Sequence, residues 1–538
     1  MKTFKYITIS TLLLISIKFT SQTVDLGFPI SFSISNLKPI NDVLQMPNFD
    51  LTKQLEADEY NHKNKIGPYR FGYEHIVSID LIQAKNKDVL SNGDKLYRKK
   101  IVCAGAFSVN IVFDDFYIPE GASLHVYNHD KTTIIGAYTK INNNINNSLG
   151  TSLVKGEEII VEYYEPSSIS NSRLLIGMVV HGYRDINNWY PKKVNESGSC
   201  NLDVICPDGI LWYNEKRSVA RIVVGGGLCT GGLVNNTLQD GTPYFLTANH
   251  CNPGSMSNAI FKFNYDSPIC GSQTSSNSQA PSGNNSINGS SLIASNSSSD
   301  FGLIELNSIP PASYGIYYAG WNNSGSTPQT AVSIHHPMGD VKKISFDDDV
   351  LQTASVSGNA NMWKIEAWER NTTTEGGSSG GGLWDENNYL IGQLYGGQAN
   401  CSNSVNDYYG KFSMSWTGNN SSQSNKRLKD WLDPNNSGVT TLNGFDPNTV
   451  SIATNSKNNI ELLIHPNPSE DFVIIRVNSN RSNDYKLSIF DMSGKIIFKS
   501  LIMNNEEIDI NLKDFAPGVY VISVFGHDIF THKKLIKK

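Results

Sequence analysis

The sequence lacks a surplus of basic residues and, beyond its first twenty residues, any long apolar run. It has 44 Lys and Arg against 50 Asp and Glu, a net charge of −6, and only 17% of its 538 residues are charged. Nucleic-acid-binding proteins usually display a basic surface, and a membrane-spanning helix needs about 20 consecutive apolar residues. The composition therefore argues against a nucleic-acid partner and against an integral membrane segment in the mature protein.

The first residues have the layout of an export signal. Lys2 and Lys5 precede an apolar stretch over 7–17, and small or polar residues follow at 20–22. This order is typical of a cleaved secretory signal peptide, here 1–22, and the apolar stretch is too short for the alternative, an uncleaved anchor. Export would expose the chain to conditions in which disulfides form.

Cysteines are few and unevenly placed. Of seven, six lie between residues 200 and 401, and Cys103 lies alone upstream. Six cysteines in one exported segment favour three disulfides. The spacing alone does not determine which cysteines pair. The sequence has no Cys-x-x-Cys pair, so neither a zinc site nor a thioredoxin-like redox site is indicated.

Runs of β-forming residues separated by turn residues predict an all-β protein of several domains. Residues 23–193 are expected to be a β-sandwich-like pro-domain with strands near 100–107, 109–113, 123–127, 157–164 and 174–181. Residues 194–434 hold the six clustered cysteines, and 435–459 are interpreted as a linker. Residues 460–538 are expected to form a small β-sandwich with strands near 471–477, 485–490, 495–498, 507–511 and 519–524.

Three short motifs in the middle segment supply the groups that acyl transfer requires. His250 follows an apolar run, Asp300 heads another, and Ser379 lies in a glycine-rich turn. A serine hydroxyl is a weak nucleophile until a base removes its proton, and that base must be held in the right tautomer by a third group. The order His, Asp, Ser is that of the double-barrel serine proteases. We therefore predict a Ser-His-Asp triad.

The motifs resemble those of one protease family across nearly the whole middle segment. They are 198–207 (GSCNLDVICP), 229–237 (CTGGLVNNT), 244–251 (YFLTANHC), 334–340 (IHHPMGD), 376–381 (GGSSGG) and 391–397 (IGQLYGG). Together they resemble the lysyl endopeptidase branch of the chymotrypsin-like serine proteases. The resemblance implies a double β-barrel catalytic domain, with His250 as general base and acid, Asp300 as its orienting partner and Ser379 as nucleophile.

The resemblance also implies roles for neighbouring residues. Ser379 is preferred to Ser378 as nucleophile because it is the third position of the Gly-x-Ser-Gly turn. The N–H groups of Gly377 and Ser379 would form the oxyanion hole. The implied disulfides are Cys200–Cys401, Cys206–Cys270 and Cys229–Cys251, which leaves Cys103 unpaired.

Substrate specificity is expected to depend on Asp407 and on the strand at 390–397. In the family an acidic residue lies at the bottom of the S1 pocket, and Asp407 matches it, which implies cleavage after lysine; arginine stays possible on charge alone. An exposed loop aspartate is the structural alternative. Tyr395, Gly396 and Gly397 are expected to bind substrate backbone and side chains, and Tyr395 stands where the family commonly has histidine.

No cofactor and no metal are expected. His335, His336 and Asp340 could be imagined as metal ligands, but further ligands at a metal-type spacing are missing from the sequence.

Trypsin-like zymogens use an acidic residue directly before the catalytic serine, where this chain has Ser378. A pro-domain that assists folding or blocks the site fits better, and we expect self-cleavage after Lys193.

The last unit resembles the type A C-terminal sorting domain of the type IX secretion system. The resemblance depends on 464–469 (IHPNPS), on the turn residues Gly494, Pro517 and Gly518, and on the basic end at 533–538. It implies export through the periplasm to the cell surface or medium, with the secretion machinery as partner. A small carbohydrate- or protein-binding β-domain is the alternative.

The sequence thus predicts a secreted, monomeric serine endopeptidase that cuts proteins or peptides after lysine. The alternatives are an enzyme that cuts after arginine or after both residues, a catalytically silent surface-binding protein, and a purely structural surface protein. Intact His250, Asp300 and Ser379 argue against the silent binder, and the glycine-rich turn argues against the structural protein.

Overall fold

The computed structural model describes residues 27–64, 66–83, 87–187, 189, 197–271, 285–356, 361–447, 460–479, 484–491, 496–504, 506–526 and 529–538. The expected signal peptide, the expected cut after Lys193 and residues 448–459 of the expected linker lie outside these ranges. The chain divides into two compact units, Met1–Asn448 and Thr449–Lys538. Within the described ranges, no helix is both long and apolar enough to cross a membrane.

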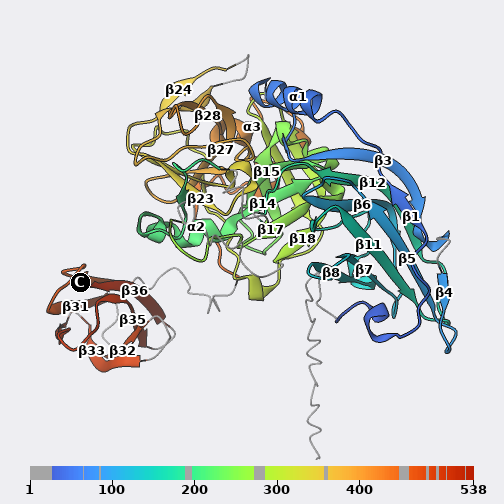
Figure 1. Ribbon diagram of the computed structural model, residues 1–538. Helices are drawn as coiled ribbons and strands as arrows, with labels where there is room; N and C mark the ends of the chain where they lie inside the picture. The colour runs from blue at the N-terminus through green and yellow to red at the C-terminus, as the bar shows by residue number, and fades with distance from the viewer. Residues whose placement is uncertain are drawn as a thin grey trace, which may run out of the picture. The chain divides into compact units, whose positions relative to one another are not determined.

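The N-terminal part of the first unit is a sandwich of two sheets, as its strand pattern predicts (Figure 1). One sheet has the order β1-β5-β11-β7-β8 with β4 beside β5, and the other has the order β10-β6-β12-β3 with β9 beside β6. Their bounds are β1 Val43–Gln45, β3 Gly72–Asp80, β4 Lys87–Val89, β5 Lys95–Val102, β6 Ser108–Tyr117, β7 Ser123–Asn128, β8 Ile134–Tyr138, β9 Leu149–Gly150, β10 Val154–Lys155, β11 Glu158–Glu165 and β12 Arg173–Gly182.

Alternating apolar side chains of the two sheets meet in one buried core, to which Val109, Ile111 and Phe113 of β6 and Val126 of β7 contribute. Such alternation buries one face of each strand. Cys103 also lies in this core and forms no disulfide. Burial raises the pKa of its thiol to about 12, so the thiolate that would react is absent at neutral pH.

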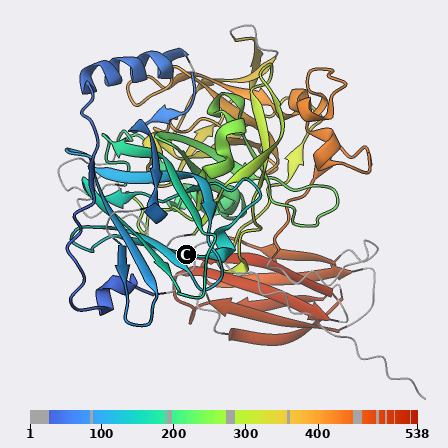
Figure 2. The same ribbon diagram turned by 90° about the vertical axis from the view of Figure 1, so that its right-hand side faces the viewer.

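A helix and a short strand lie between β1 and β3 of the sandwich, and the sequence did not predict either. Helix α1, Leu51–Asn64, begins after Asp50, whose side chain accepts hydrogen bonds from the N–H groups of Thr52 and Lys53, as an N-cap does. Strand β2, Tyr69–Arg70, joins no strand of the sandwich and pairs instead with β15, Gly227–Leu233, of the following part. In both views α1 lies at the rim of that part, apart from β5 and β11 (Figures 1 and 2).

Residues 197–447 are built on two sheets that are antiparallel except where β21 pairs with β27 in parallel. The eight-stranded sheet runs β18-β17-β14-β15-β16-β20-β19 and includes β2. Its other bounds are β14 Val219–Val224, β16 Tyr244–Ala248, β17 Ile260–Phe263, β18 Ser286–Asn288, β19 Ser290–Asn296 and β20 Phe301–Leu306. Helix α2, Tyr213–Ser218, leads into β14.

The ten-stranded sheet runs β13-β23-β22-β26-β27-β28-β25-β24, with β21 beside β27 and β29 beside β21. Its bounds are β13 Leu202–Asp203, β21 Trp321–Asn322, β22 Ala331–His335, β23 Lys343–Asp347, β24 Gln352–Ala354, β25 Met362–Ala367, β26 Gly382–Asp385, β27 Leu390–Gly397, β28 Val405–Lys411 and β29 Thr441–Leu442. Helices α3, Phe412–Thr417, and α4, Lys429–Leu432, follow β28.

One buried cluster joins the two sheets. It includes Leu246 and Leu303 of the first sheet and Ile334 and Trp384 of the second. Two sheets packed on a common core match the two-lobed β architecture expected for the catalytic segment. The loops at the junction of the sheets are therefore held on both sides by rigid strands.

The second unit is also a sandwich, seen as two layers in Figure 2. Its sheets have the orders β30-β31-β34 and β33-β32-β35-β36. The bounds are β30 Ile460–His465, β31 Phe472–Ser479, β32 Asp484–Asp491, β33 Ile496–Met503, β34 Glu507–Asn511, β35 Gly518–Gly526 and β36 Ile529–Lys537. The basic end of the chain is part of β36, which pairs with β35, and Leu535 of this strand is fully buried.

Candidate active site

His250 and Asp300 lie at neighbouring ends of paired strands of the eight-stranded sheet. His250 follows β16 and Asp300 directly precedes β20, and Ala248 pairs with Phe301. The Nδ1 atom of His250 lies 2.8 Å from Asp300 Oδ2, and the His250 N–H donates to Asp300 Oδ1 at 2.9 Å. One carboxylate therefore fixes both the ring and the backbone of the histidine.

Asp300 adopts a conformation that its side chain disfavours. Its φ of 52° lies in the left-handed region, which costs a non-glycine residue on the order of 1–3 kcal/mol unless its surroundings impose it. The Asn249 N–H donates to the Asp300 carbonyl at 2.8 Å, and the carboxylate is held by His250. Backbone strain is concentrated at the residue that orients the histidine.

Ser379 comes from the second sheet, in the turn before β26, and is half-buried. The Ser379 carbonyl accepts a hydrogen bond from the Thr230 N–H of β15 at 2.8 Å. The N–H of the next residue, Gly380, donates a hydrogen bond to the Leu394 carbonyl of β27 at 2.9 Å. Ser379 lines a small pocket together with His250. The two sheets thus bring the serine and the histidine to one place.

Ser378 and Ser379 have different surroundings. Ser378 is fully buried, and its Oγ lies 2.8 Å from His335 Nδ1 and accepts from the Glu375 N–H at 3.4 Å. The structure therefore places Ser378 in a buried polar network and Ser379 at a cavity, which agrees with Ser379 as the candidate nucleophile.

The glycine-rich turn presents two backbone amides. Among the residues that the structure describes, the N–H groups of Gly377 and Ser379 donate to no other protein atom, whereas the intervening Ser378 N–H donates to the Glu375 carbonyl at 3.1 Å. Gly377 has a φ of 90°, a region that L side chains avoid. Its positive φ makes glycine the fitting residue at this point of the turn.

The two histidines that could be imagined as metal ligands both have protein partners. His335 Nε2 lies 3.0 Å from Ser345 Oγ, and His336 Nδ1 lies 2.9 Å from the Asp340 carbonyl. Burial lowers the pKa of His335 to about 3, so its ring is neutral at physiological pH. Its contacts connect the turn at Ser378 to β23.

Asp407 lies inside the second sheet, on β28, and is only 1% exposed. Its Oδ2 accepts from the Trp368 indole N–H at 2.7 Å and also from the Thr374 hydroxyl. On one side it pairs with Gly397 of β27. The alternative prediction, that Asp407 is an exposed loop aspartate, is wrong because its carboxylate is buried.

Strand β27 contributes the other predicted substrate-binding residues. The Tyr395 ring packs edge-on against the His250 ring, with centroids 5.9 Å apart. A Cβ on Gly397 would lie 1.7 Å from the Asn406 carbonyl oxygen and 2.5 Å from Asp407 Oδ1, so only glycine fits there. Gly396 has a φ of 121° and forms part of a register shift between β27 and β28.

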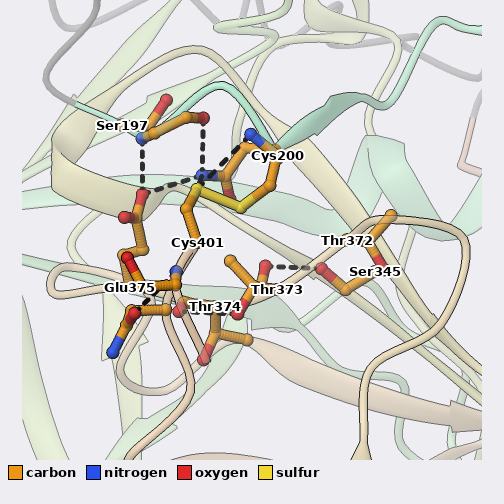
Figure 3. Close-up of a disulfide and its surroundings, with 12 residues drawn as sticks. Ser197, Cys200, Ser345, Thr372, Thr373, Thr374, Glu375 and Cys401 are labelled. Atoms are coloured by element: carbon orange, nitrogen blue, oxygen red, sulfur yellow. Dashed lines mark hydrogen bonds between the residues drawn. A yellow bond between two sulfur atoms is a disulfide. The ribbon is translucent and has the colours of Figure 1, made fainter. Parts of the chain in front are cut away.

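Glu375 ties the start of this segment to the glycine-rich turn (Figure 3). Its Oε2 accepts from the Gly198 N–H at 2.8 Å and from Asn201 Nδ2 at 2.7 Å. Beside it runs the disulfide Cys200–Cys401. The other disulfides are Cys206–Cys270 and Cys229–Cys251, and the three pairs are those that the resemblance implies.

Comparison with known families adds a direct match for the middle segment and for the C-terminal unit. Residues 194–410 match the family model "Lysyl endopeptidase, C-terminal domain", and residues 463–538 match "Secretion system C-terminal sorting domain". These matches confirm the predicted resemblance of residues 194–410 to lysyl endopeptidases and the predicted sorting domain.

A lysyl endopeptidase of Pseudomonas aeruginosa is 29% identical over an alignment of 301 residues, and the match covers 50% of this chain and 62% of that protein. Solved structures similar to this chain include the active form of the Rv3671c protease from M. tuberculosis, with a TM-score of 0.27, 15% identity, and 39% of this chain and 83% of that one covered. A Glu endopeptidase in complex with MPD has a TM-score of 0.26 and 19% identity, with 40% and 93% covered.

The candidate site of the lysyl endopeptidase-like domain is covered by the N-terminal part of the chain. The pocket at His250 and Ser379 is otherwise lined by Asp58, Asn61, His62, Gly67, Pro68, Tyr69 and Arg70, and its volume is about 10 Å³. A volume of that size holds about one water molecule. Sequence reasoning missed these residues, because no local pattern tells which distant segment fills a cleft.

Proposed function

We propose that this protein is a secreted serine endopeptidase that cleaves on the carboxyl side of lysine. The observation that carries the proposal is the pairing of His250 with Asp300 at 2.8 Å beside a pocket that Ser379 also lines. The match of residues 194–410 to the lysyl endopeptidase family model supports it. So does the P. aeruginosa relative, although the chain spans only 62% of that relative's length.

In the proposed reaction His250 Nε2 takes the proton of Ser379 Oγ as this oxygen attacks the substrate carbonyl carbon. Asp300 holds His250 Nδ1–H and stabilises the imidazolium that forms. The amides of Gly377 and Ser379 donate to the oxyanion, and each such donor is worth about 2.7–4 kcal/mol in transition-state stabilisation. His250 then protonates the leaving amine, and a water molecule, deprotonated by His250, hydrolyses the acyl-enzyme.

Asp407 supports the preference for a basic residue before the scissile bond. A buried carboxylate is costly without a positive partner, so a pocket that ends on it favours a cationic side chain. Asp407 is the single acidic residue of β28. The alternative, cleavage after arginine or after both residues, uses the same carboxylate.

We further propose that residues 23–193 are a pro-domain, that 194–434 are the catalytic domain, and that maturation follows a cut after Lys193. The sorting domain match supports export, and we propose the type IX secretion machinery as the partner that carries the protein through the periplasm to the surface or medium. Residues 435–459 would then link the enzyme to a sorting domain at 460–538.

The test is mass-spectrometric mapping of cleavage sites in a denatured protein mixture, with the processed protein beside its Ser379→Ala form. Cuts almost wholly after lysine that disappear in the variant are the expected result. Cuts after arginine as well would keep the mechanism and overturn the specificity. No cleavage by a correctly processed wild-type protein would favour a silent binding protein instead.

A further inference from the structure

The carboxylate of Asp407 is held unevenly. Its Oδ2 atom accepts two hydrogen bonds, from Trp368 Nε1 at 2.7 Å and from Thr374 Oγ1. Trp368 is 4% exposed and Thr374 is 3% exposed, so neither donor is readily replaced by water. Two lone pairs of one oxygen are therefore already used.

Protein contacts hold the Trp368 donor in place. The Trp368 N–H donates to the Ser404 carbonyl at 2.9 Å, just after β25, and its ring packs against Tyr409 of β28. Thr374 lies in the segment that leads to Ser379. The Oδ1 atom faces β27, since a Cβ on Gly397 would lie 2.5 Å from it. The carboxylate is thus oriented with Oδ2 away from that strand.

Lysine and arginine make different demands on such a group. A guanidinium binds a carboxylate best with two parallel N–H bonds, one to each oxygen. With Oδ2 occupied, an arginine would reach only one oxygen and would leave buried N–H groups without acceptors, which is costly. An ammonium is a compact charge with three rotatable donors, and one carboxylate oxygen suffices for it.

We propose that Trp368 and Thr374 are the positioning residues that make this site select lysine over arginine. This inference rests on the proposed function, since it explains the specificity of that same site. Both residues act through Asp407, by withdrawing one of its oxygens from the substrate.

The test compares two peptides that differ only in lysine or arginine before the scissile bond. Thr374→Val and Trp368→Phe should each lower the ratio of kcat/KM for lysine over arginine by at least about tenfold, the worth of a hydrogen bond to a charged group. Thr374→Ser keeps the hydroxyl and should keep the ratio. The acid limb of the pH profile should also move to higher pH in both variants, because the carboxylate loses a donor that stabilises its charged form.

Active-site titration with a serine-directed reagent corrects each rate for the fraction of folded enzyme. An unchanged ratio in Thr374→Val and Trp368→Phe, with the wild type cutting after lysine, would overturn this inference and leave the proposed function intact. A wild type that cuts neither peptide would overturn the proposed function itself. If one variant does not fold, the ratio in the other decides.

A different observation concerns the N-terminal segment over the catalytic pocket. Strand β2 adds to the edge of β15, with Tyr69 opposite Leu228 and Arg70 opposite Gly227. Tyr69 and His62 pack on the backbone of Gly376, where a Cβ would lie 2.5 Å and 3.0 Å from their rings. Gly67 and Pro68, just before β2, line the pocket of His250 and Ser379.

One buried carboxylate holds this segment together. Asp58 of α1 is 6% exposed, and it pairs with Arg70 at 2.7 Å and with Arg184 at 2.9 Å. It also accepts from the Tyr183 hydroxyl at 2.6 Å. The helix, the added strand and the end of β12 are therefore joined through Asp58.

The sandwich itself is packed on the catalytic part. Phe71, Val180 and Ile186 share a buried cluster with Val223, Leu228 and Ile260. This apolar contact fixes the sandwich against the eight-stranded sheet and holds the pocket-lining residues of 58–62 and 67–70 in place.

We infer that helix α1 and residues 66–70 keep the unprocessed enzyme latent by strand addition beside its site, and that Asp58 is the residue that holds them there. Strand addition at a sheet edge is a common mode of peptide binding. An occupant in that place excludes a substrate from Ser379.

The test measures how fast a fluorophosphonate probe labels Ser379 in the intact chain, resolved from processed enzyme by gel. Asp58→Ala should label at least about tenfold faster than wild type, because a buried ion-pair cluster loses its centre. Asp42→Ala is the matched control: it removes the Lys99–Asp42 pair of the same sandwich and should label like wild type.

Tyr69→Ala removes the contact with Gly376 and the ring that lies 5.1 Å from the Arg184 guanidinium, but it keeps the ion pairs of Asp58. It should also label faster even if Asp58→Ala loosens the whole sandwich. Intact wild type that labels as fast as the processed enzyme would overturn the inference. That result would leave the proposed function standing, since it concerns only access to a working serine.

Discussion

Ser378 Oγ and His335 Nδ1 lie 2.8 Å apart in a fully buried space behind the glycine-rich turn. His335 in turn reaches Ser345, whose hydroxyl donates to the Thr373 carbonyl at 2.7 Å (Figure 3). Ser378 occupies the position at which trypsin-like zymogens have an acidic residue. The hydrogen bonds of Ser378, His335 and Ser345 hold the turn through neutral groups, with no ion pair.

Ser378→Ala should therefore weaken both stability and turnover. The substitution leaves a buried ring nitrogen of His335 without its partner, which costs about 1–3 kcal/mol in free energy of unfolding. We expect kcat to fall with little change in KM, since the amides of Gly377 and Ser379 lose their support. Thermal unfolding and steady-state kinetics measure the two effects. Ser324→Ala, at an exposed loop position, is the control. A variant with wild-type kcat would show that the turn keeps its shape without the network.

Asp300→Asn should lower kcat by about 10⁴-fold, because an amide favours the wrong tautomer of the neighbouring histidine. The side chains are isosteric, so the His250 N–H keeps an acceptor and the fold should survive. Kinetics of the processed enzyme, with thermal unfolding as a check of folding, measure this. A loss of less than about tenfold would remove Asp300 from the proposed triad.

Asp347→Asn should change stability in a pH-dependent way. Burial raises the pKa of Asp347 to about 7, with Glu369 and Asp349 adding negative charge nearby. Since the folded-state pKa lies above the ordinary value of 3.8, the stability contributed by the protonated group is fully present below about pH 4 and is lost as the pH rises through about 7.

The difference in Tm between Asp347→Asn and wild type should therefore become more positive from about pH 4 to about pH 8. Other titrating groups are common to both proteins and cancel in this difference. A difference that is constant over that range would show that Asp347 keeps an ordinary pKa.

Removal of the Cys229–Cys251 disulfide should affect activity more than removal of Cys206–Cys270. Cys251 directly follows His250, and the bridge closes a separation of 22 residues, against 64 for the other. Each loss should cost about 3–4 kcal/mol in free energy of unfolding. Paired Cys→Ala variants, compared by kcat under conditions where both are folded, should show the larger decrease for the first pair. Equal decreases would show that the bridge does not position His250.

Much of the architecture could be read from local patterns. Alternation of apolar residues located the strands of both sandwiches, because one face of each strand must be buried. The expected strand at 100–107, however, is in fact β5 at Lys95–Val102, since residues before it also fit a two-residue period. The sequence predicted no strand at the basic end 533–538, where pairing with β35 forms β36, Ile529–Lys537.

The sequence by itself determined which chemical groups the protein has: a histidine, an aspartate and a serine in the order of a protease family, six cysteines in an exported segment, and a sorting domain at the end. These features are encoded in residue types and short motifs, which need no third dimension to be recognised. Only the tertiary structure decided what lies around them. It buried Asp407 against Trp368 and Thr374, placed Ser378 in a closed network, and laid residues of 58–62 and 67–70 over His250 and Ser379. Such contacts join residues that are not neighbours in the sequence, and their geometry follows from how whole sheets pack rather than from any local pattern.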